Sequence, residues 1–254
     1  MSNLAVGPLR RLPLEGAVNF RDLGGYETED GRKVRWRTVF RSDALNALTA
    51  TDHMALRKIG VRLVCDLRLP GERKRAPNAL PTDADIERLE QGFIPLGTLD
   101  MLANLRAGTL SGEAIIAEVT THYWHMPRDH GETFGMILRR LAEPTARPAV
   151  IHCTSGKDRT GFTVALVLLA LGVPLETVFE DYLLTNQYRR DVSKLLDLPI
   201  SEGDMAILTS ARRGYLETAF NSMLDLHGSV GGYLREALGV DDALRARLRT
   251  ALLE

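Results

Sequence analysis

The chain has 254 residues, of which 44% are hydrophobic and 26% are charged, and its formal net charge at pH 7 is −1. This length supports one large domain, and the nearly neutral charge excludes the global basic field that attracts nucleic acid. Two cysteines are too few for a secreted disulfide scaffold, and no apolar run reaches the roughly 20 residues of an integral membrane span. We therefore expect a single domain over residues 1–254.

The first eight residues, Met1 to Pro8, lack a charged region followed by an apolar core. The sequence therefore predicts no conventional signal peptide. A protein of this kind is expected in the cytoplasm, or outside the cell if it is exported without such a signal.

Residues 12–26 mix turn formers with two large apolar side chains, which indicates a short extended segment that ends at a glycine pair. Within it, Arg21 and Asp22 are expected to form a charged pair that holds the segment in place, and a direct role beside the substrate is the alternative. Residues 34–42 alternate apolar and polar side chains and predict a strand. Arg41 near the end of that strand is a candidate phosphate contact, with a structural ion pair as the alternative.

A second strand is predicted over 61–68, and its nearly continuous apolar side chains indicate burial on both faces, as in a parallel sheet. Asp66 and Arg68 come at its end, where α/β sheets place their ligands. Cys65 is expected to be a small buried apolar side chain, and a reversible disulfide with Cys153 is the alternative.

The other predicted elements are mostly helices, some of them with capping signals such as Asp241. Their histidines do not form a metal-binding pattern, so we expect no metal ligands among them. The segments are a helix near 51–59, a weaker strand within 86–96 around Phe93, helices over about 97–130 and 131–142, and helices over 178–186, 204–226, 229–237 and 241–253.

The most informative stretch is a short apolar strand over 149–151, a tight loop, and a buried helix from about Arg159 that Gly172 ends. Loop amides at a helix N-terminus bind oxyanions such as phosphate, and the helix dipole adds partial positive charge there. Cys153 at the floor of the loop lies in the same field, which favours its thiolate. Cys153 is therefore a candidate nucleophile.

The remaining loop residues complete an anion site. Arg159 offers a planar fork that matches two oxygens of a phosphoryl group, and Thr160 can donate its hydroxyl to the sulfur anion. The residues expected around a bound phosphate are Thr154, Ser155, Gly156, Lys157, Thr160 and, at the end of the strand predicted over 34–42, Arg41.

The pattern His152-Cys153, five residues, Arg159-Thr160-Gly161 resembles the phosphate loop of the cysteine-dependent protein tyrosine phosphatases. The full run His-Cys-Thr-Ser-Gly-Lys-Asp-Arg-Thr-Gly is similar to a bacterial branch that includes secreted phosphatases of mycobacteria and listeria. Further matches to that branch cover nearly the whole chain: Asn-Phe-Arg-Asp at 19–22, Arg-Ser at 41–42, Asp-Leu-Arg at 66–68 followed by Glu72, Asp-Tyr-Leu-Leu-Thr-Asn at 181–186, and the run from Gly228.

The resemblance implies a tyrosine-phosphatase-like α/β fold with a central, mostly parallel sheet flanked by helices and a helical C-terminal part. It also suggests that the helices over about 97–130 form part of a lid over the site, with ordinary helical packing as an equal alternative. It implies hydrolysis of phosphotyrosine through a phosphocysteine, with phosphoserine, phosphothreonine and phosphoinositides as further substrates. The expected partner is thus a phosphorylated protein or a phosphoinositide. No cofactor is implied.

The leaving oxygen of such a reaction needs a proton from a carboxylic acid within reach. Two aspartates match positions of the branch: Asp158 inside the loop, which we prefer, and Asp66 at the end of the neighbouring strand. The alternative role of Asp66 is to orient Arg159 or Lys157. Lys157 itself is expected at the rim, as a second cation for another phosphate or a phosphoinositide headgroup.

Two other functions fit parts of the pattern. A phosphate-binding module without turnover would share the loop, but it would not need Cys153, Arg159 and two candidate acids. A sulfurtransferase would share a cysteine loop on an α/β sheet, but the histidine before Cys153 and the Arg-Thr-Gly that begins at Arg159 disfavour it. Neither the physiological substrate nor the oligomeric state follows from the sequence.

Overall fold

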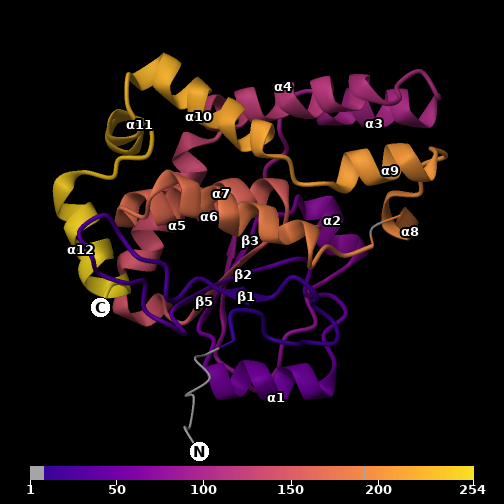
Figure 1. Ribbon diagram of the computed structural model, residues 1–254. Helices are drawn as coiled ribbons and strands as arrows, with labels where there is room; N and C mark the ends of the chain where they lie inside the picture. Colours follow the sequence, from indigo (N-terminus) through magenta and orange to yellow (C-terminus); the bar gives the residue numbers. More distant parts are fainter. Residues whose placement is uncertain (1–8, 192) are drawn as a thin grey trace, which may run out of the picture.

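The fold is described from a computed structural model, which covers residues 9–191 and 193–254 (Figure 1). The expectation about a signal peptide concerns residues 1–8 and lies outside this part of the chain. A five-stranded sheet with the order β1-β2-β5-β3-β4 forms the centre. Its strands are β1 (Arg21–Asp22), β2 (Val39–Ser42), β3 (Leu63–Asp66), β4 (Glu87–Glu90) and β5 (Ala149–His152).

Only the pairing of β1 with β2 is antiparallel in this sheet, and the three other pairings are parallel. The predicted α/β class with a mostly parallel sheet is therefore confirmed. The helices that surround it are α1 (Ala50–Ile59), α2 (Pro70–Arg75), α3 (Thr98–Arg106), α4 (Glu113–Asp129), α5 (Gly131–Ala142), α6 (Asp158–Leu171), α7 (Leu175–Leu183), α8 (Ser193–Leu196), α9 (Glu202–Thr209), α10 (Arg213–His227), α11 (Val230–Glu236) and α12 (Asp242–Leu252), with short 3-10 turns η1 (Pro144–Ala146) and η2 (Leu184–Asn186).

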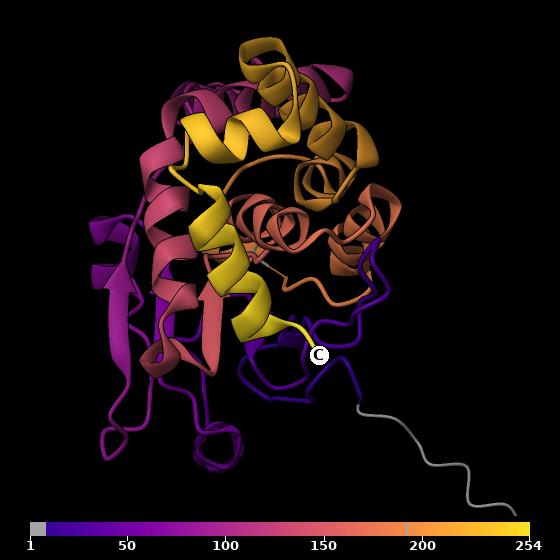
Figure 2. The same cartoon turned by 90° about the vertical axis from the view of Figure 1, so that its left-hand side faces the viewer.

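Two hydrophobic cores lie on the two faces of the sheet, because successive strand residues point to opposite sides. Val64 and Val150 pack with Leu56 of α1 in the smaller core. Cys65 and Ile151 belong to the larger core, which the long apolar helix α6 dominates. Figures 1 and 2 show α1 on one side of the sheet, α5, α6, α7 and α12 on the other, and α3, α4, α9 and α10 as a further layer. The larger core therefore connects the sheet to this outer layer.

Several predicted boundaries are confirmed by local signals. Helix α6 runs from Asp158 to Leu171, and Gly172 caps its end in the left-handed conformation with a φ of 87°. Thr49 caps α1 by accepting a hydrogen bond from the amide of Asp52, and Asp241 caps α12 in the same way. Each of these capping residues interacts with backbone only three or four residues away, so a local sequence pattern is enough to predict the helix end.

Several predicted elements differ from the observed ones in extent, and three of them differ most. The strand expected over 34–42 is reduced to β2, because Arg37 has a φ of 60° and turns the chain before it. The strand expected around Phe93 lies earlier, as β4, and Phe93 is in the loop that follows. The helix expected over 204–226 is divided into α9 and α10, because the amide group of Asn186 binds both backbone groups of Ala211 at 2.8 Å and holds that residue outside a helix.

In the part of the chain that the structure describes, no helix combines the length and the apolar composition that a bilayer span requires. The same described residues contain no cluster of three or more histidine, cysteine, aspartate or glutamate side chains able to hold a metal ion.

Candidate active site

The loop that joins β5 to α6 lies at the carboxyl ends of three parallel strands, the edge at which α/β sheets bind ligands. Within the described chain, the amides of Thr154, Ser155 and Gly156 form no hydrogen bond. These N–H groups and the N-terminus of α6 therefore offer a cradle for an oxyanion. Cys153 begins the loop and is only 2% exposed, so its sulfur is covered in this conformation.

A close contact with β2 shapes the loop at Gly156. This residue has a φ of 72°, and a Cβ atom there would lie 2.7 Å from the carbonyl oxygen of Ser42. Arg41 supports the same point, because its Nη2 donates to the carbonyl oxygen of Gly156 at 2.7 Å. Its Nη1 forms an ion pair of 2.5 Å with the buried Asp181. Arg41 thus holds the loop from behind, and its expected contact with a phosphate receives no support here.

Asp181 also organises the N-terminal segment. Arg21 donates to the carbonyl oxygen of Asp181 at 2.8 Å and lies 3.6 Å from its carboxylate. Burial would raise the pKa of Asp181, but the charges of Arg41 and Arg21 lower it overall. The expected pairing of Arg21 with Asp22 is wrong, since Asp22 instead accepts from the amide of Arg37 at 2.8 Å. This cluster therefore links the segment around Arg21 to the strand and helix that support the loop.

Glu72 holds the guanidinium of Arg159 with both carboxylate oxygens. The two N···O distances are 2.7 and 2.8 Å, and a third donor, the hydroxyl of Thr154, reaches Glu72 at 2.6 Å. Burial would raise the pKa of Glu72, but the hydrogen bonds and charge of Arg159 lower it to about 2. Burial likewise opposes the charge of Arg159, yet Glu72 and the nearby Cys153 raise the pKa of Arg159 above its ordinary value. The arginine is thus a permanently charged, fixed group.

Asp66 ends β3 beside His152, the last residue of β5, but both oxygens of its carboxylate already accept hydrogen bonds. One oxygen accepts from the amide and Nε of Arg68, and the other accepts from Nη2 of Arg68 at 2.7 Å and from Asn78 at 2.9 Å. Burial would raise the pKa of Asp66, whereas the contacts with His152 and Arg68 lower it strongly overall. The suggested orientation of Arg159 or Lys157 by Asp66 is wrong, because Glu72 holds Arg159 and Asp66 pairs with Arg68 instead.

Asp158 is arranged differently. Its Oδ1 accepts from the hydroxyl of Tyr123 at 2.9 Å and lies 3.4 Å from the ammonium of Lys157. Its other oxygen, Oδ2, has no hydrogen-bond partner within the described residues, and the side chain is 33% exposed. Asp158 therefore keeps one carboxyl oxygen available, which Asp66 does not.

Lys157 does not lie at the rim, as we expected. The residue is 4% exposed, and its ammonium donates to the carbonyl oxygen of Leu208 in α9 at 2.6 Å. The outer layer of helices thus covers the loop at two points, with Tyr123 of α4 over Asp158 and Leu208 of α9 over Lys157. Part of this cover comes from the segment 97–130 that we expected to form a lid, and part from α9, which we did not.

The remaining loop side chains have separate environments. The hydroxyl of Ser155 accepts from the amide of Lys157 at 3.3 Å. The hydroxyl of Thr160 is buried and has no partner within the described residues, so its donation to sulfur stays a prediction. Both cysteines are free, and burial raises the pKa of the Cys65 thiol to about 12.

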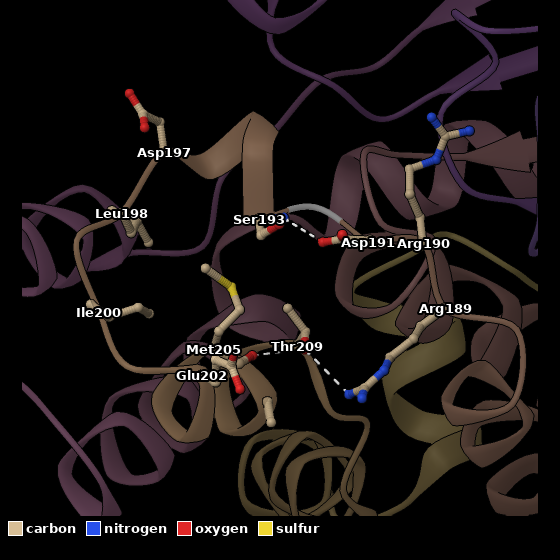
Figure 3. Close-up of a pocket in the computed structure, with 11 residues that line it drawn as sticks. Arg189, Arg190, Asp191, Ser193, Asp197, Leu198, Ile200, Glu202, Met205 and Thr209 are labelled. Atoms are coloured by element: carbon tan, nitrogen blue, oxygen red, sulfur yellow. Dashed lines mark hydrogen bonds between the residues drawn. The ribbon is translucent and has the colours of Figure 1, made fainter.

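A groove of about 420 Å³ lies beside this cover, between α9 and the segment that follows α7 (Figure 3). Arg189 extends toward Thr209 in it, with an N···O distance of 3.3 Å, while Arg190 is paired with Asp43. Its lining mixes acidic, basic and apolar side chains, and the loop residues are not part of that lining. The groove is thus separate from the loop that carries Cys153.

The structure brings three further groups to the site: the carboxylate of Glu72, which the sequence identified only as a family match without a role, and the hydroxyl of Tyr123 and the carbonyl of Leu208, which sequence reasoning missed. A signal existed only for Glu72, which lies in the first turn of a helix directly after the ligand-binding end of a strand. A tyrosine in an amphipathic helix and a backbone carbonyl carry no comparable pattern.

The chain is similar to known proteins over nearly its whole length. The profile of the tyrosine phosphatase family matches residues 12–254. A Cupriavidus necator protein with a provisional tyrosine-protein phosphatase name is 32% identical over 91% of this chain and 85% of its own length. The triple specificity protein phosphatase PtpB of Mycobacterium tuberculosis is 32% identical over 96% of this chain and 99% of its own.

A more distant structural likeness exists to TpbA of P. aeruginosa, solved in complex with phosphotyrosine. The TM-score is 0.38 with 15% identity, and the alignment covers 70% of this chain and 87% of that one. The family profile spans nearly every residue from the N-terminal segment to the end of the chain, and the chain belongs to the tyrosine phosphatase family.

Proposed function

We propose that the protein hydrolyses phosphate monoesters through a phosphocysteine on Cys153. One observation carries this proposal most: the guanidinium of Arg159, fixed by Glu72, stands at the end of a loop whose amides are unbonded around Cys153. A thiolate nucleophile, a fixed cation and free N–H donors in one loop are what a phosphoryl transfer needs.

The reaction has two steps. The sulfur of Cys153 attacks phosphorus while the bond from phosphorus to the ester oxygen breaks, and the leaving oxygen takes a proton from an acid. Water then attacks the phosphocysteine, the S–P bond breaks, and the water proton passes to the same carboxylate. Arg159 and the loop amides hold the equatorial oxygens in both steps.

Asp158 is the better candidate for that acid. A general acid needs a carboxyl oxygen that is free to carry and deliver a proton. Asp158 has such an oxygen, whereas both oxygens of Asp66 accept hydrogen bonds from Arg68 or Asn78. We assign Asp66 to the support of the loop strand, through its contact of 3.5 Å with His152.

Phosphotyrosine is the proposed main substrate, since the family and the relatives are tyrosine phosphatases. The triple specificity named for PtpB supports phosphoserine and phosphothreonine as further substrates. Phosphoinositide hydrolysis stays a prediction, and the burial of Lys157 weakens the expected route through that side chain. A panel of phosphopeptides and phosphoinositides measured at equal concentration would rank these classes.

Turnover of 4-nitrophenyl phosphate tests the proposal. We expect hydrolysis that vanadate inhibits and that Cys153→Ser abolishes. If the wild-type protein binds vanadate but releases no nitrophenol, it is a phosphate-binding module. If Cys153→Ser retains activity, the assignment of the nucleophile is wrong.

A further inference from the structure

Two buried donors, Tyr123 and Lys157, face the carboxyl group of Asp158, and a third buried group, Tyr182, contacts Tyr123. Tyr123 comes from α4, Tyr182 from α7 and Lys157 from the loop itself. The residues Tyr123 and Tyr182 are 0% and 1% exposed, so their hydroxyls have no access to bulk water. Hydroxyls in such surroundings need protein partners.

The direction of the hydrogen bonds follows from the number of protons. Tyr123 has one hydroxyl proton and donates it to Oδ1 of Asp158 at 2.9 Å. The hydroxyl of Tyr182, 2.7 Å away, must therefore donate to the oxygen of Tyr123. The ammonium of Lys157 can only donate, and it lies 3.4 Å from the same Oδ1. Oδ1 of Asp158 thus faces donors only.

We propose that Tyr123 is a positioning residue that directs the acid proton of Asp158 to Oδ2, the oxygen left for the substrate. A protonated carboxyl group has one O–H, and an oxygen that already faces two donors does not carry it. The proton consequently lies on Oδ2, and the hydrogen bond to Tyr123 fixes the rotation of the carboxyl group. This inference rests on the proposed function of Asp158 as the general acid.

Removal of the hydroxyl in Tyr123→Phe frees the carboxyl group to rotate and to place its proton on either oxygen. The loss falls on the step in which the leaving oxygen is protonated. Phenolate is a poor leaving group and depends on that proton, whereas 4-nitrophenolate departs with little help. We therefore expect kcat/KM to fall about 30-fold for phenyl phosphate and only about 3-fold for 4-nitrophenyl phosphate.

Tyr215 provides a matched control. Its ring stacks on Tyr123 with centroids 5.4 Å apart, and it is 1% exposed. Its hydroxyl has no hydrogen-bond partner within the described residues. Tyr215→Phe therefore makes the same chemical change in the same core without touching Asp158, and we expect changes below about 2-fold on both substrates.

A double-mutant cycle separates positioning from general damage. In an Asp158→Asn background, Tyr123→Phe has no acid left to position, so we expect no further selective loss on phenyl phosphate. Equal losses on both substrates for Tyr123→Phe, or a full additional selective loss in the Asp158→Asn background, would overturn the proposal. Thermal unfolding of each variant identifies a protein that fails to fold. If Tyr123→Phe fails to fold, Tyr182→Phe is the second test, because it removes only the hydroxyl that donates to Tyr123. We expect it to lower kcat/KM for phenyl phosphate selectively, by less than Tyr123→Phe would.

The proposed function fails in a different way. If Cys153→Ser remains active, the phosphocysteine route is wrong whatever Tyr123 does. If Asp158→Asn lowers kcat/KM equally for phenyl phosphate and 4-nitrophenyl phosphate, Asp158 is not the acid. The proposed role of Tyr123 is then refuted, while the assignment of Cys153 as nucleophile is unaffected.

Discussion

The pair of Glu72 and Arg159 gives the sharpest energetic prediction. Folding lowers the pKa of Glu72 from 4.5 to about 2. At about 1.4 kcal/mol for each tenfold change in acidity, this difference corresponds to about 3 kcal/mol of stability. The side chains are 22% and 14% exposed, so solvent screens the pair only partly. We expect Glu72→Gln to lower the free energy of unfolding at pH 7 by about 2–3 kcal/mol.

The sign of the pH dependence follows from the direction of the shift. Because the pKa is lower in the folded state, the stabilisation is complete above pH 4.5 and is lost as the pH falls toward about 2. The gap between wild type and Glu72→Gln should therefore narrow with falling pH. Urea unfolding followed by tryptophan fluorescence between pH 7 and pH 3.5 measures it.

Activity should fall as well, because the amide of glutamine offers only one acceptor to the fork of Arg159. A loosely held arginine misplaces the phosphoryl oxygens, and we expect kcat/KM for 4-nitrophenyl phosphate to fall about 10- to 100-fold. Glu90→Gln is the control. The carboxylate of Glu90 is 48% exposed and lies 3.2 Å from Arg73, which belongs to α2 as Glu72 does. It should change stability by less than about 0.5 kcal/mol. Equal stability of Glu72→Gln and wild type, or a gap that does not vary with pH, would refute the reasoning.

Three further outcomes follow from the same structure. Gly156→Ala should reduce kcat at least about 100-fold with the helix content unchanged, because the new Cβ would lie 2.7 Å from the carbonyl oxygen of Ser42. Kinetics equal to wild type would contradict the loop geometry. Asp66→Asn breaks the buried ion pair with Arg68 and should lower the free energy of unfolding in urea by about 3 kcal/mol. The ratio of rates on phenyl phosphate and 4-nitrophenyl phosphate should stay unchanged. A selective loss on phenyl phosphate would instead indicate that Asp66 is the acid. Burial raises the pKa of Cys65 to about 12, so iodoacetamide at pH 7 should leave this thiol unmodified in peptide mass spectra of the folded protein, and rapid labelling there would contradict its burial.

Local patterns account for what the sequence could predict. The strand, loop and helix around Cys153 are encoded within about twenty consecutive residues, where apolar runs, loop residues and Gly172 each act on their neighbours. The same is true of the capping residue Asp241. The mostly parallel sheet was predictable because residues 61–68 are apolar on both faces.

What could not be predicted depends on contacts between distant segments. Glu72 and Arg159 are 87 residues apart in the chain, and nothing near either one identifies the other. The burial of Lys157 depends on a backbone carbonyl in α9, which every residue possesses. The break between α9 and α10 depends on the side chain of Asn186, which lies 25 residues before Ala211. Tertiary contacts of this kind override local propensity.

Acid quench of the protein during turnover of a phosphotyrosine peptide, followed by mass spectrometry of the peptide that contains Cys153, tests the central claim most directly. The account predicts one phosphoryl group on Cys153 that forms within the first turnover, decays when substrate is exhausted, and is absent in Arg159→Ala. Steady hydrolysis with no phosphorylated Cys153 at any time point, or with the phosphoryl group on another residue, would contradict it.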